Sequence, residues 1–293
     1  MTFEHLENRL REYALLMRLH RPIGIYLLLW PTLWALWLAG NGQPPRGVAL
    51  VFVLGVALMR SAGCVMNDIA DRDFDPHVAR TRDRPLAAGR VGLGEAVGLA
   101  VTLCLIAFAL VLTQNALTVK LSFVGLALAM TYPLMKRWHH LPQAHLGAAF
   151  GWGIPMAYAA ITDRLPLEAW LLFLGNVLWS VIYDTQYAMV DREDDRKIGV
   201  KSTALWFGDR DKRIIGYLQA ALLALLVAIG LLTGRGWPYY LGLFAASWFA
   251  LYQQYLIRDR APEECFKAFL NNNGFGLAIF CGLLLDFLPA GLP

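Results

Sequence analysis

The sequence predicts an all-α, polytopic membrane protein, and three observations support this fold class. Hydrophobic residues fill 57% of the 293 positions and charged residues only 16%, whereas soluble domains carry about 25% charged residues. Apolar runs of about 18 residues or more, each long enough for one membrane crossing, recur along the chain. Lysines and arginines gather in alternate loops between these runs, as they do in membrane proteins with a fixed orientation.

Nine apolar runs are candidate transmembrane helices. They cover residues 23–40, 48–66, 93–112, 116–135, 144–162, 167–188, 213–233, 237–257 and 270–288. Residues 1–22 are polar and basic with apolar residues at helical spacing, which predicts a short helix on the membrane surface. That segment lacks the small-residue cleavage site of a signal peptide. We therefore expect a single integral-membrane domain over residues 1–293.

The distribution of positive charge predicts the orientation. With a cytoplasmic N-terminus, 21 of the 26 lysines and arginines fall on the cytoplasmic side and only Arg46, Arg164 and Arg235 on the other. This asymmetry satisfies the positive-inside rule, and a wrong helix count would scramble it. We expect the N-terminus inside and the C-terminus outside, in what we take to be a bacterial cell inner membrane. Basic residues confined to short loops argue against a nucleic-acid partner, and no obligatory protein partner is evident.

The first of two long cytoplasmic loops, roughly 67–92, begins with acidic residues in helical phase. At about 100° per residue, Asn67, Asp68, Asp71 and Asp75 share one face of a helix. Asp73 points elsewhere. These four side chains could therefore converge on one ligand.

The second long loop, roughly 189–212, has the same character. If the helix stays regular, Asp184, Asp191 and Asp195 form a narrow stripe, and Glu193 and Asp194 point away. A solvated, charge-balanced loop is the plain interpretation of either segment alone. Two phased segments on the same membrane face favour a binding site instead.

The chemistry of these side chains predicts a magnesium and diphosphate site. Like charges one turn apart repel each other, so a compensating cation is expected. Oxygen donors without histidine or cysteine suit Mg²⁺, which is usually held by one or two carboxylates plus substrate phosphates. A diphosphate site that opens into an apolar bundle indicates an isoprenoid diphosphate. The metal would neutralise the leaving diphosphate, and an apolar cavity would keep water from the allylic cation.

The spacings Asn67-Asp68-x-x-Asp71-x-x-x-Asp75 and Asp191-x-x-x-Asp195 resemble the two signature motifs of the UbiA-type intramembrane prenyltransferases. The resemblance extends along the whole chain. Flanking strings are similar to the members that prenylate 4-hydroxybenzoate in ubiquinone synthesis. These strings are His20-Arg-Pro-Ile-Gly24, Arg84-Pro-Leu-Ala-Ala-Gly89, Tyr183-Asp-Thr-Gln-Tyr-Ala-Met-Val-Asp191 and Lys201-Ser-Thr-Ala204.

The resemblance implies a ring-shaped bundle of nine helices around a central cavity. It implies transfer of a polyprenyl group from a polyprenyl diphosphate to the ring carbon ortho to the hydroxyl of 4-hydroxybenzoate, with Mg²⁺ as cofactor. The metal would be held through the diphosphate by Asn67, Asp68, Asp71, Asp75, Asp191 and Asp195. Four of these, Asp71, Asp75, Asp191 and Asp195, would form the catalytic set together with Asp184.

Further side chains are candidates for substrate binding or proton transfer. An arginine within a membrane span needs a partner, so Arg60 binds either the 4-hydroxybenzoate carboxylate or an aspartate on a neighbouring helix. Arg84 and Lys201 could close over the diphosphate, and Asp184 could help to remove the phenol or ring proton. Three residues at the end of the fourth run bind substrate or only set topology: Tyr132, Lys136 and Arg137.

Two other classes of protein compete with this interpretation. A transporter also carries acids within its membrane spans, although usually near the middle of the bilayer. A non-catalytic assembly subunit would not need two matched acidic segments. Within the enzyme class, a related prenyltransferase could use a different acceptor, such as a dihydroxynaphthoate, haem or chlorophyllide.

Overall fold

The fold is built from helices alone over the residues that the computed structural model describes, which are 3–73, 75–77, 81–199 and 201–288. The helices are α1 (Phe3–Leu16), α2 (Ile23–Ala39), α3 (Arg46–Asp71), α4 (Leu93–Val111), α5 (Ala116–Trp138), α6 (Pro142–Gly151), α7 (Gly153–Thr162), α8 (Leu167–Val190), α9 (Arg192–Ile198), α10 (Thr203–Phe207), α11 (Asp211–Leu232), α12 (Trp237–Leu256) and α13 (Pro262–Phe287). Three 3-10 turns join them: η1 (Asp75–His77), η2 (Gly208–Arg210) and η3 (Ile257–Asp259). The all-α prediction is confirmed for these ranges.

The helices agree with the predicted apolar runs, although not every run qualifies as a membrane span. Within the described ranges, six helical segments are long and apolar enough to cross a membrane. They include α3, α4, α5, α8 and α13, together with the stretch Thr203–Leu232 that contains α11. The apolar helix α2 has 17 residues, one short of the 18 required. The membrane class therefore stands, and the count of nine spans and the orientation stay predictions.

The fifth predicted run is split into two ten-residue helices, α6 and α7. Pro155 lies in the first turn of α7 and has no N–H to donate to the carbonyl of Gly151, and its ring crowds that carbonyl. The break falls at Trp152, between two glycines. Gly151 packs so closely on α8 that a Cβ there would lie 2.4 Å from Nδ2 of Asn176. The two half-helices therefore fit against α8 where one straight helix would not.

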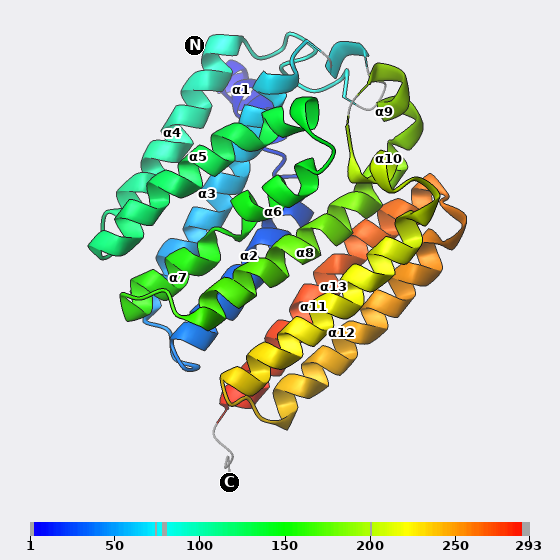
Figure 1. The fold of residues 1–293 in the computed structure, drawn as a ribbon. Helices are drawn as coiled ribbons and strands as arrows, with labels where there is room; N and C mark the ends of the chain where they lie inside the picture. The colour runs from blue at the N-terminus through cyan, green and yellow to red at the C-terminus, as the bar shows by residue number, and fades with distance from the viewer. Residues whose placement is uncertain (1–2, 74, 78–80, 200, 289–293) are drawn as a thin grey trace.

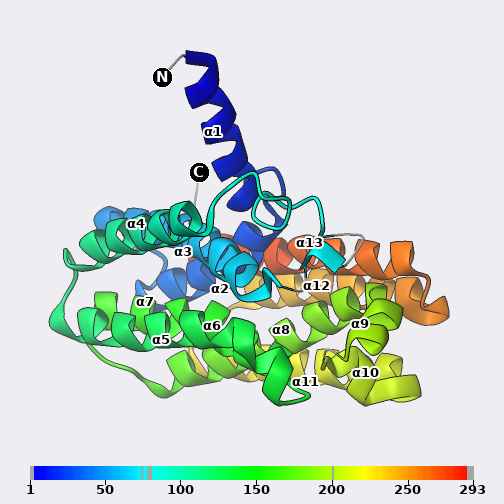
Figure 2. The same ribbon diagram turned by 90° about the horizontal axis from the view of Figure 1, so that it is seen from above.

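Successive helix contacts close a ring. The contacts run from α2 through α3, α4, α5, α6, α8, α11, α12 and α13 back to α2. Figure 2 shows α4, α3, α2 and α13 along one side of this ring and α5, α6, α8 and α11 along the other. At the contact of α12 with α13, Gly242 and Gly282 let the backbones approach, since a Cβ on Gly242 would lie 2.7 Å from the Gly282 Cα.

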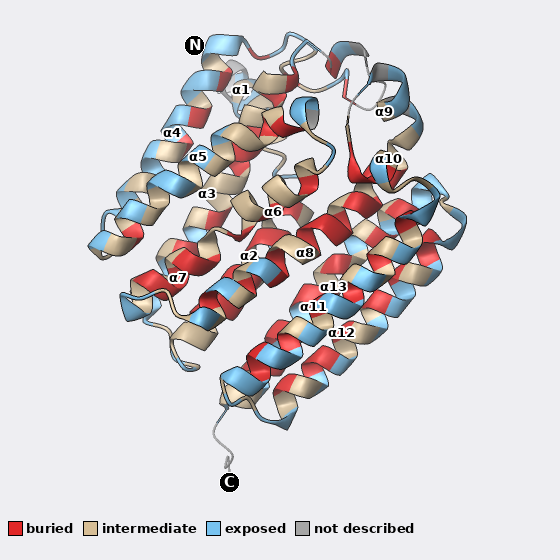
Figure 3. Cartoon of the chain, in the orientation of Figure 1, coloured by how far each residue is buried: buried red, intermediate tan, exposed pale blue. Residues whose placement is uncertain are grey.

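The outward faces of the ring are apolar, which suits a lipid environment. Tyr217 and Trp237 are 74% and 76% exposed although they are large and hydrophobic. Figure 3 shows buried positions concentrated on α7 and α8, with exposed positions along α4, α11 and α12. The inner core includes Trp34, Trp179 and Tyr239, each almost fully buried. The rings of Trp34 and Trp179 lie 5.3 Å apart and pack α2 against α8.

Both acidic segments lie at one end of the bundle. Figure 1 shows the N-terminus, α1, α9 and α10 at this end and the C-terminus at the opposite end. Leu16 of α1 packs against Val65 of α3 and Ala96 of α4. An ion pair between Arg9 and Glu95 also holds α1 to the bundle. The predicted surface helix is therefore fixed beside the acidic segments.

Candidate active site

A cavity of about 560 Å³, hereafter the site cavity, opens between both acidic segments. Its walls come from α2, α3, α5, α6, α8, α9 and α13 and from the loop before α4. Every predicted site residue lines it except Lys136, whose side chain lies outside the described part of the structure. These lining residues are Arg60, Asn67, Asp68, Asp71, Asp75, Arg84, Tyr132, Arg137, Asp184, Asp191, Asp195 and Lys201.

The first acidic group is assembled from a helix end and a turn. Asp68 and Asp71 lie on the last turn of α3, and Nδ2 of Asn67 donates to Oδ2 of Asp71 over 3.1 Å. The expectation of one regular helix through Asp75 is wrong, because α3 ends at Asp71 and Asp75 begins η1. The Thr81 hydroxyl donates to the Asp75 carbonyl over 2.9 Å and so helps to hold the turn. All three carboxylates are buried, at 2%, 4% and 6% exposure.

Two arginines offset part of the negative charge of this group. Arg84 donates to Asp68 over 3.0 Å and to Asp75 over 2.9 Å, and Arg18 donates to Asp68 over 2.5 Å. Burial raises the pKa of the Asp75 carboxyl, while Arg84 opposes that rise. For Arg18, burial is the largest single influence and lowers the guanidinium pKa, but Asp68 and the neighbouring Cys64, Tyr132 and Tyr187 together raise it, so the net shift is upward. Guanidinium groups held at carboxylates are well placed to receive a phosphate.

The second acidic group also lies at a helix break. The continuous helix assumed for Asp184, Asp191 and Asp195 is interrupted at Asp191, which ends α8 and precedes α9. The backbone N–H of Asp195 donates to the Asp191 carbonyl over 2.8 Å, so the two side chains stay one turn apart. All three still face the site cavity.

The acids set aside by the helical phasing lie away from the site cavity where the structure describes them. The side chains of Asp73 and Glu193 are 78% and 74% exposed. The side chain of Asp194 lies outside the described residues. The phasing therefore separated the lining acids Asp71 and Asp195 from the exposed ones despite the helix breaks.

Arg60 projects into the site cavity from α3 and rests on Gly24 of α2. A Cβ on Gly24 would lie 2.1 Å from the Arg60 Nε. The guanidinium lies 5.8 Å from the Phe150 ring and contacts the Cys64 sulfur. Its Nε is buried and makes no hydrogen bond, and no ion pair to Arg60 occurs within the described residues. The choice between a substrate carboxylate and a neighbouring aspartate as the partner of Arg60 stays a prediction.

The remaining candidates are positioned by backbone and side-chain contacts. The Tyr132 hydroxyl donates to the Gly63 carbonyl over 3.2 Å, and Arg137 donates to the Ala70 carbonyl over 2.5 Å. These two hydrogen bonds hold the end of α5 against α3. Lys201 donates to the Trp138 carbonyl over 3.1 Å, so the loop after α9 reaches back to α5. Asp184 of α8 and Gln143 of α6 both line the site cavity.

A second cavity of about 310 Å³, hereafter the apolar groove, adjoins the site cavity. The two share Arg60, Tyr132 and Phe150 as lining residues. The groove is otherwise walled mainly by apolar side chains of α2 to α7. Two of its lining residues, Leu105 and Phe123, are more than half exposed on α4 and α5. The groove therefore leads from Arg60 to the outer surface between these helices.

The donors in the site cavity suit a hard cation. They are carboxylates and an amide, the oxygen ligands that Mg²⁺ prefers. Within the described part of the chain, no three acidic, histidine or cysteine side chains are close enough to form a ready metal cage. This fits an ion that keeps waters and is bound partly through substrate phosphates.

Several lining residues escaped the sequence analysis. Arg18 counted there only as a topology charge, yet it pairs with Asp68. Gln143 and Phe269 lie outside every motif and predicted apolar run, and Tyr187 was quoted only as part of the string Tyr183–Asp191. The rings of Tyr187 and Phe269 lie 4.9 Å apart. The string that begins at His20 could have drawn attention to Arg18, which lies two residues before it. Nothing in the sequence marks Gln143.

Comparisons with known proteins agree with this geometry. The sequence profile described as the UbiA prenyltransferase family matches residues 28–279. The 4-hydroxybenzoate octaprenyltransferase of Alkalilimnicola ehrlichii is 62% identical over 291 residues, which cover 99% of each chain. A solved UbiA homolog from Aeropyrum pernix shares 27% identity at a TM-score of 0.80, over 90% of this chain and 98% of that one. A UbiA homolog from Archaeoglobus fulgidus bound to GPP and Mg²⁺ shares 18% identity at a TM-score of 0.68, over 92% and 99% of the two chains.

Proposed function

Because the chain belongs to the UbiA prenyltransferase family, we propose that it transfers a polyprenyl group to 4-hydroxybenzoate. The donor is a polyprenyl diphosphate, and the products are 3-polyprenyl-4-hydroxybenzoate and diphosphate, an early step of ubiquinone synthesis. The enzyme is a prenyltransferase, and the relative at 62% identity carries the name of this activity. We further propose that it works in a bacterial inner membrane with the site cavity open to the cytoplasm.

One observation carries the proposal. Two acidic groups face the same cavity, and that cavity continues into an apolar groove at Arg60, Tyr132 and Phe150. A substrate with a charged diphosphate head and a long apolar tail matches this arrangement from end to end. A small polar solute would not need an apolar groove for its binding.

The acidic end is proposed to hold the diphosphate with Mg²⁺. Asn67, Asp68, Asp71, Asp75, Asp191 and Asp195 supply the oxygen donors, and the homolog from Archaeoglobus fulgidus was solved with GPP and Mg²⁺. When bound, the metal neutralises the negative charge of the leaving diphosphate. Arg18, Arg84 and Lys201 add direct charge at the same end and orient the phosphates.

The acceptor is proposed to lie between the acidic end and the groove. The Arg60 guanidinium binds the carboxylate of 4-hydroxybenzoate, and Tyr132 and Arg137 line the same wall. Asp184, beside Gln143, accepts the proton that leaves the phenol or the ring. The apolar side chains of the groove surround the allylic carbon and exclude water, so the acceptor ring is the nucleophile.

The decisive experiment is a product analysis. Membranes that contain the protein are supplied with Mg²⁺, 4-hydroxybenzoate and polyprenyl diphosphates of increasing length, and the products are identified by mass. We expect a 3-polyprenyl-4-hydroxybenzoate that disappears when Mg²⁺ is chelated. Product only with a dihydroxynaphthoate, or another aromatic acceptor offered in parallel, would overturn the choice of acceptor. Solute uptake into sealed vesicles without a prenylated product would favour a transporter.

A further inference from the structure

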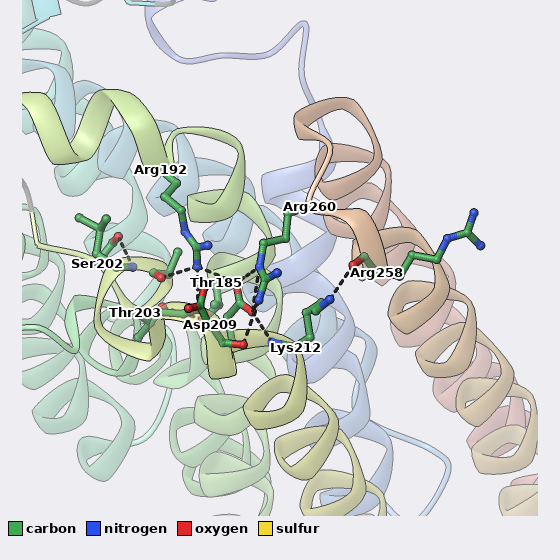
Figure 4. A network of polar contacts seen from close by, with 12 residues as sticks. Thr185, Arg192, Ser202, Thr203, Asp209, Lys212, Arg258 and Arg260 are labelled. Atoms are coloured by element: carbon green, nitrogen blue, oxygen red, sulfur yellow. Dashed lines mark hydrogen bonds and ion pairs between the residues drawn. The ribbon is translucent and has the colours of Figure 1, made fainter.

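A buried polar cluster lies behind the second acidic group, outside the site cavity. At its centre is Asp211, the first residue of α11, with 0% exposure. Its carboxylate accepts hydrogen bonds from Arg192 over 2.6 Å, from Arg260 over 2.8 Å and from the Lys212 N–H over 2.7 Å. Figure 4 shows Arg192 and Arg260 converging on this point from two different segments. Neither arginine nor Asp211 is among the described residues that line the site cavity.

Arg192 organises the segment that follows Asp191. Its guanidinium also donates to the Ala204 carbonyl over 2.6 Å and to the Gly208 carbonyl over 3.1 Å. One side chain thus gathers α9, α10 and the start of α11 around itself. The helix α9 has only seven residues, and helices shorter than about 12 residues are marginal without tertiary contacts. The placement of Asp195 on α9 therefore depends on how Arg192 is held.

Arg260 connects the same carboxylate to α13. It lies at the end of η3 with a φ of 56°, and it donates to the Asp209 carbonyl over 2.9 Å as well as to Asp211. The helix that follows brings Phe266 and Phe269 to the site cavity. Asp211 therefore joins the segment that bears the second acidic group to α13, which supplies another part of the cavity wall.

We propose that Asp211 is a positioning residue, which fixes Arg192 and thereby holds α9 so that Asp191 and Asp195 face the diphosphate. The inference rests on the proposed function, because it assigns a task to a diphosphate site. Asp211 touches no substrate itself. Its loss would leave two arginines without their shared carboxylate and would release the short helix that follows Asp191.

The test compares Asp211→Asn with a matched control at the other end of the bundle. The Asp286 side chain is only 6% exposed and also accepts from an arginine, Arg235 over 3.3 Å, and from a backbone N–H, Gly236 over 2.7 Å. Asp286→Asn therefore removes the same kind of contact far from the site cavity. Asp211→Glu keeps the charge and should recover part of the effect.

Two readouts are measured on the full-length protein in detergent. The first is hydrogen exchange of the α9 amides, which needs no substrate. The second is the dissociation constant for a non-hydrolysable polyprenyl diphosphate analogue with Mg²⁺. We expect faster exchange in α9 and about a tenfold or larger rise of that constant in Asp211→Asn, as for other groups that orient metal-site ligands. Asp286→Asn should leave both readouts close to the wild type.

The outcomes separate this inference from the proposed function. If wild type fails to bind the analogue, the diphosphate site is wrong and the inference falls with it, whatever the exchange data show. If wild type binds but Asp211→Asn neither loosens α9 nor weakens binding, the positioning role is wrong and the diphosphate site stands. If Asp211→Asn and Asp286→Asn loosen α9 and weaken analogue binding equally, the positioning role is also wrong, since such losses would reflect general destabilisation.

Discussion

The arginines beside the two acidic groups have different kinds of partner. In the first acidic group, Arg84 bridges Asp68 and Asp75 directly within the cavity. In the second, Arg192 faces away from the cavity and pairs with Asp211 instead. The first group therefore already has positive charge at the point where a phosphate would bind. Arg192, the residue after Asp191 in the chain, thus contributes to the packing of α9 and not to the lining of the site cavity.

Replacing one carboxylate in each group tests the need for both. We expect Asp71→Asn and Asp191→Asn each to lower kcat by about a hundredfold or more, the usual loss when one preorganised charge is removed from an active site. The measurement is prenyl transfer in membranes, with insertion checked by the amount of protein in the membrane fraction. Asp73→Asn is the control, because that side chain is 78% exposed. Near-normal turnover in either site variant would contradict the proposal that both acidic groups are needed for prenyl transfer.

Gly24 gives a test of Arg60 that leaves the arginine itself in place. A methyl group at Gly24 would overlap the guanidinium, so Gly24→Ala should displace Arg60 from its position. Losing a hydrogen bond to a charged group costs about 1.5–3 kcal/mol, or roughly a tenfold to hundredfold rise in KM at about 1.4 kcal/mol per factor of ten. We expect this rise for 4-hydroxybenzoate and little change for the prenyl donor.

The control for this variant is Gly98→Ala on α4, where an added methyl meets nothing within 4 Å. Arg60→Ala should reproduce the acceptor defect of Gly24→Ala. Equal increases in the KM of both substrates would remove Arg60 from the proposed carboxylate role.

Much of the cavity lining could be predicted from the sequence, because a short break in a helix does not move the residues that follow to another side. Asp71 and Asp75 were selected on the assumption of one helix, yet Asp75 reaches the cavity from a 3-10 turn. Long-range pairs were beyond such an argument. The contact between Arg18 and Asp68 spans 50 positions, and the contact between Arg260 and Asp211 spans 49. No local pattern encodes which arginine meets which carboxylate across a folded bundle.

At the scale of helices, α4 and α5 define the outer end of the apolar groove. Leu105 and Phe123 line the groove and are exposed at the same time. A polyprenyl tail that follows the groove from Arg60 would pass between these helices toward lipid. The groove should therefore accept tails of different length, provided that its inner part stays wide.

Narrowing the groove should change the preference among donors. Ala107 on α4 is buried and lines the groove. Overpacking of this kind costs about 1–3 kcal/mol, so Ala107→Phe should lower kcat/KM for long donors by roughly tenfold relative to the shortest one. The measurement is a competition between donors of different length. Ala109→Phe, on the exposed face of the same helix, is the control, and a uniform loss over all donors in Ala107→Phe would argue against the groove as the tail site.

The position of a helix could be predicted wherever a long apolar run is enough to define it. α8 and α13 carry buried stretches long enough that the apolar run defines the element. The split of α6 from α7 was not predicted, although Pro155 lies within the predicted run 144–162. A proline permits a kink or a break, and the close fit of Gly147 and Gly151 against α8 selects the break. That choice depends on tertiary packing, which one sequence does not display.

For the molecule as a whole, positive charge and acidic groups gather at one end. The N-terminus, α9 and α10 lie there, and the C-terminus lies at the other end. This is the arrangement that 21 cytoplasmic lysines and arginines against three external ones would impose on an odd number of spans. The charge distribution predicts that the site cavity faces the cytoplasm.

Labelling of single cysteines tests this orientation in whole cells. After the four native cysteines are replaced, Thr113→Cys between α4 and α5 should react with an impermeant maleimide in intact cells, since that loop is predicted outside. Asp83→Cys, before α4, should react only after permeabilisation, because its loop is held inside by positive charge. A C-terminal alkaline phosphatase fusion should be active, as nine spans require. The reverse labelling pattern would show that the predicted orientation is wrong. Equal labelling of both loops would show that α4 does not cross the membrane. An inactive fusion would exclude an odd number of spans.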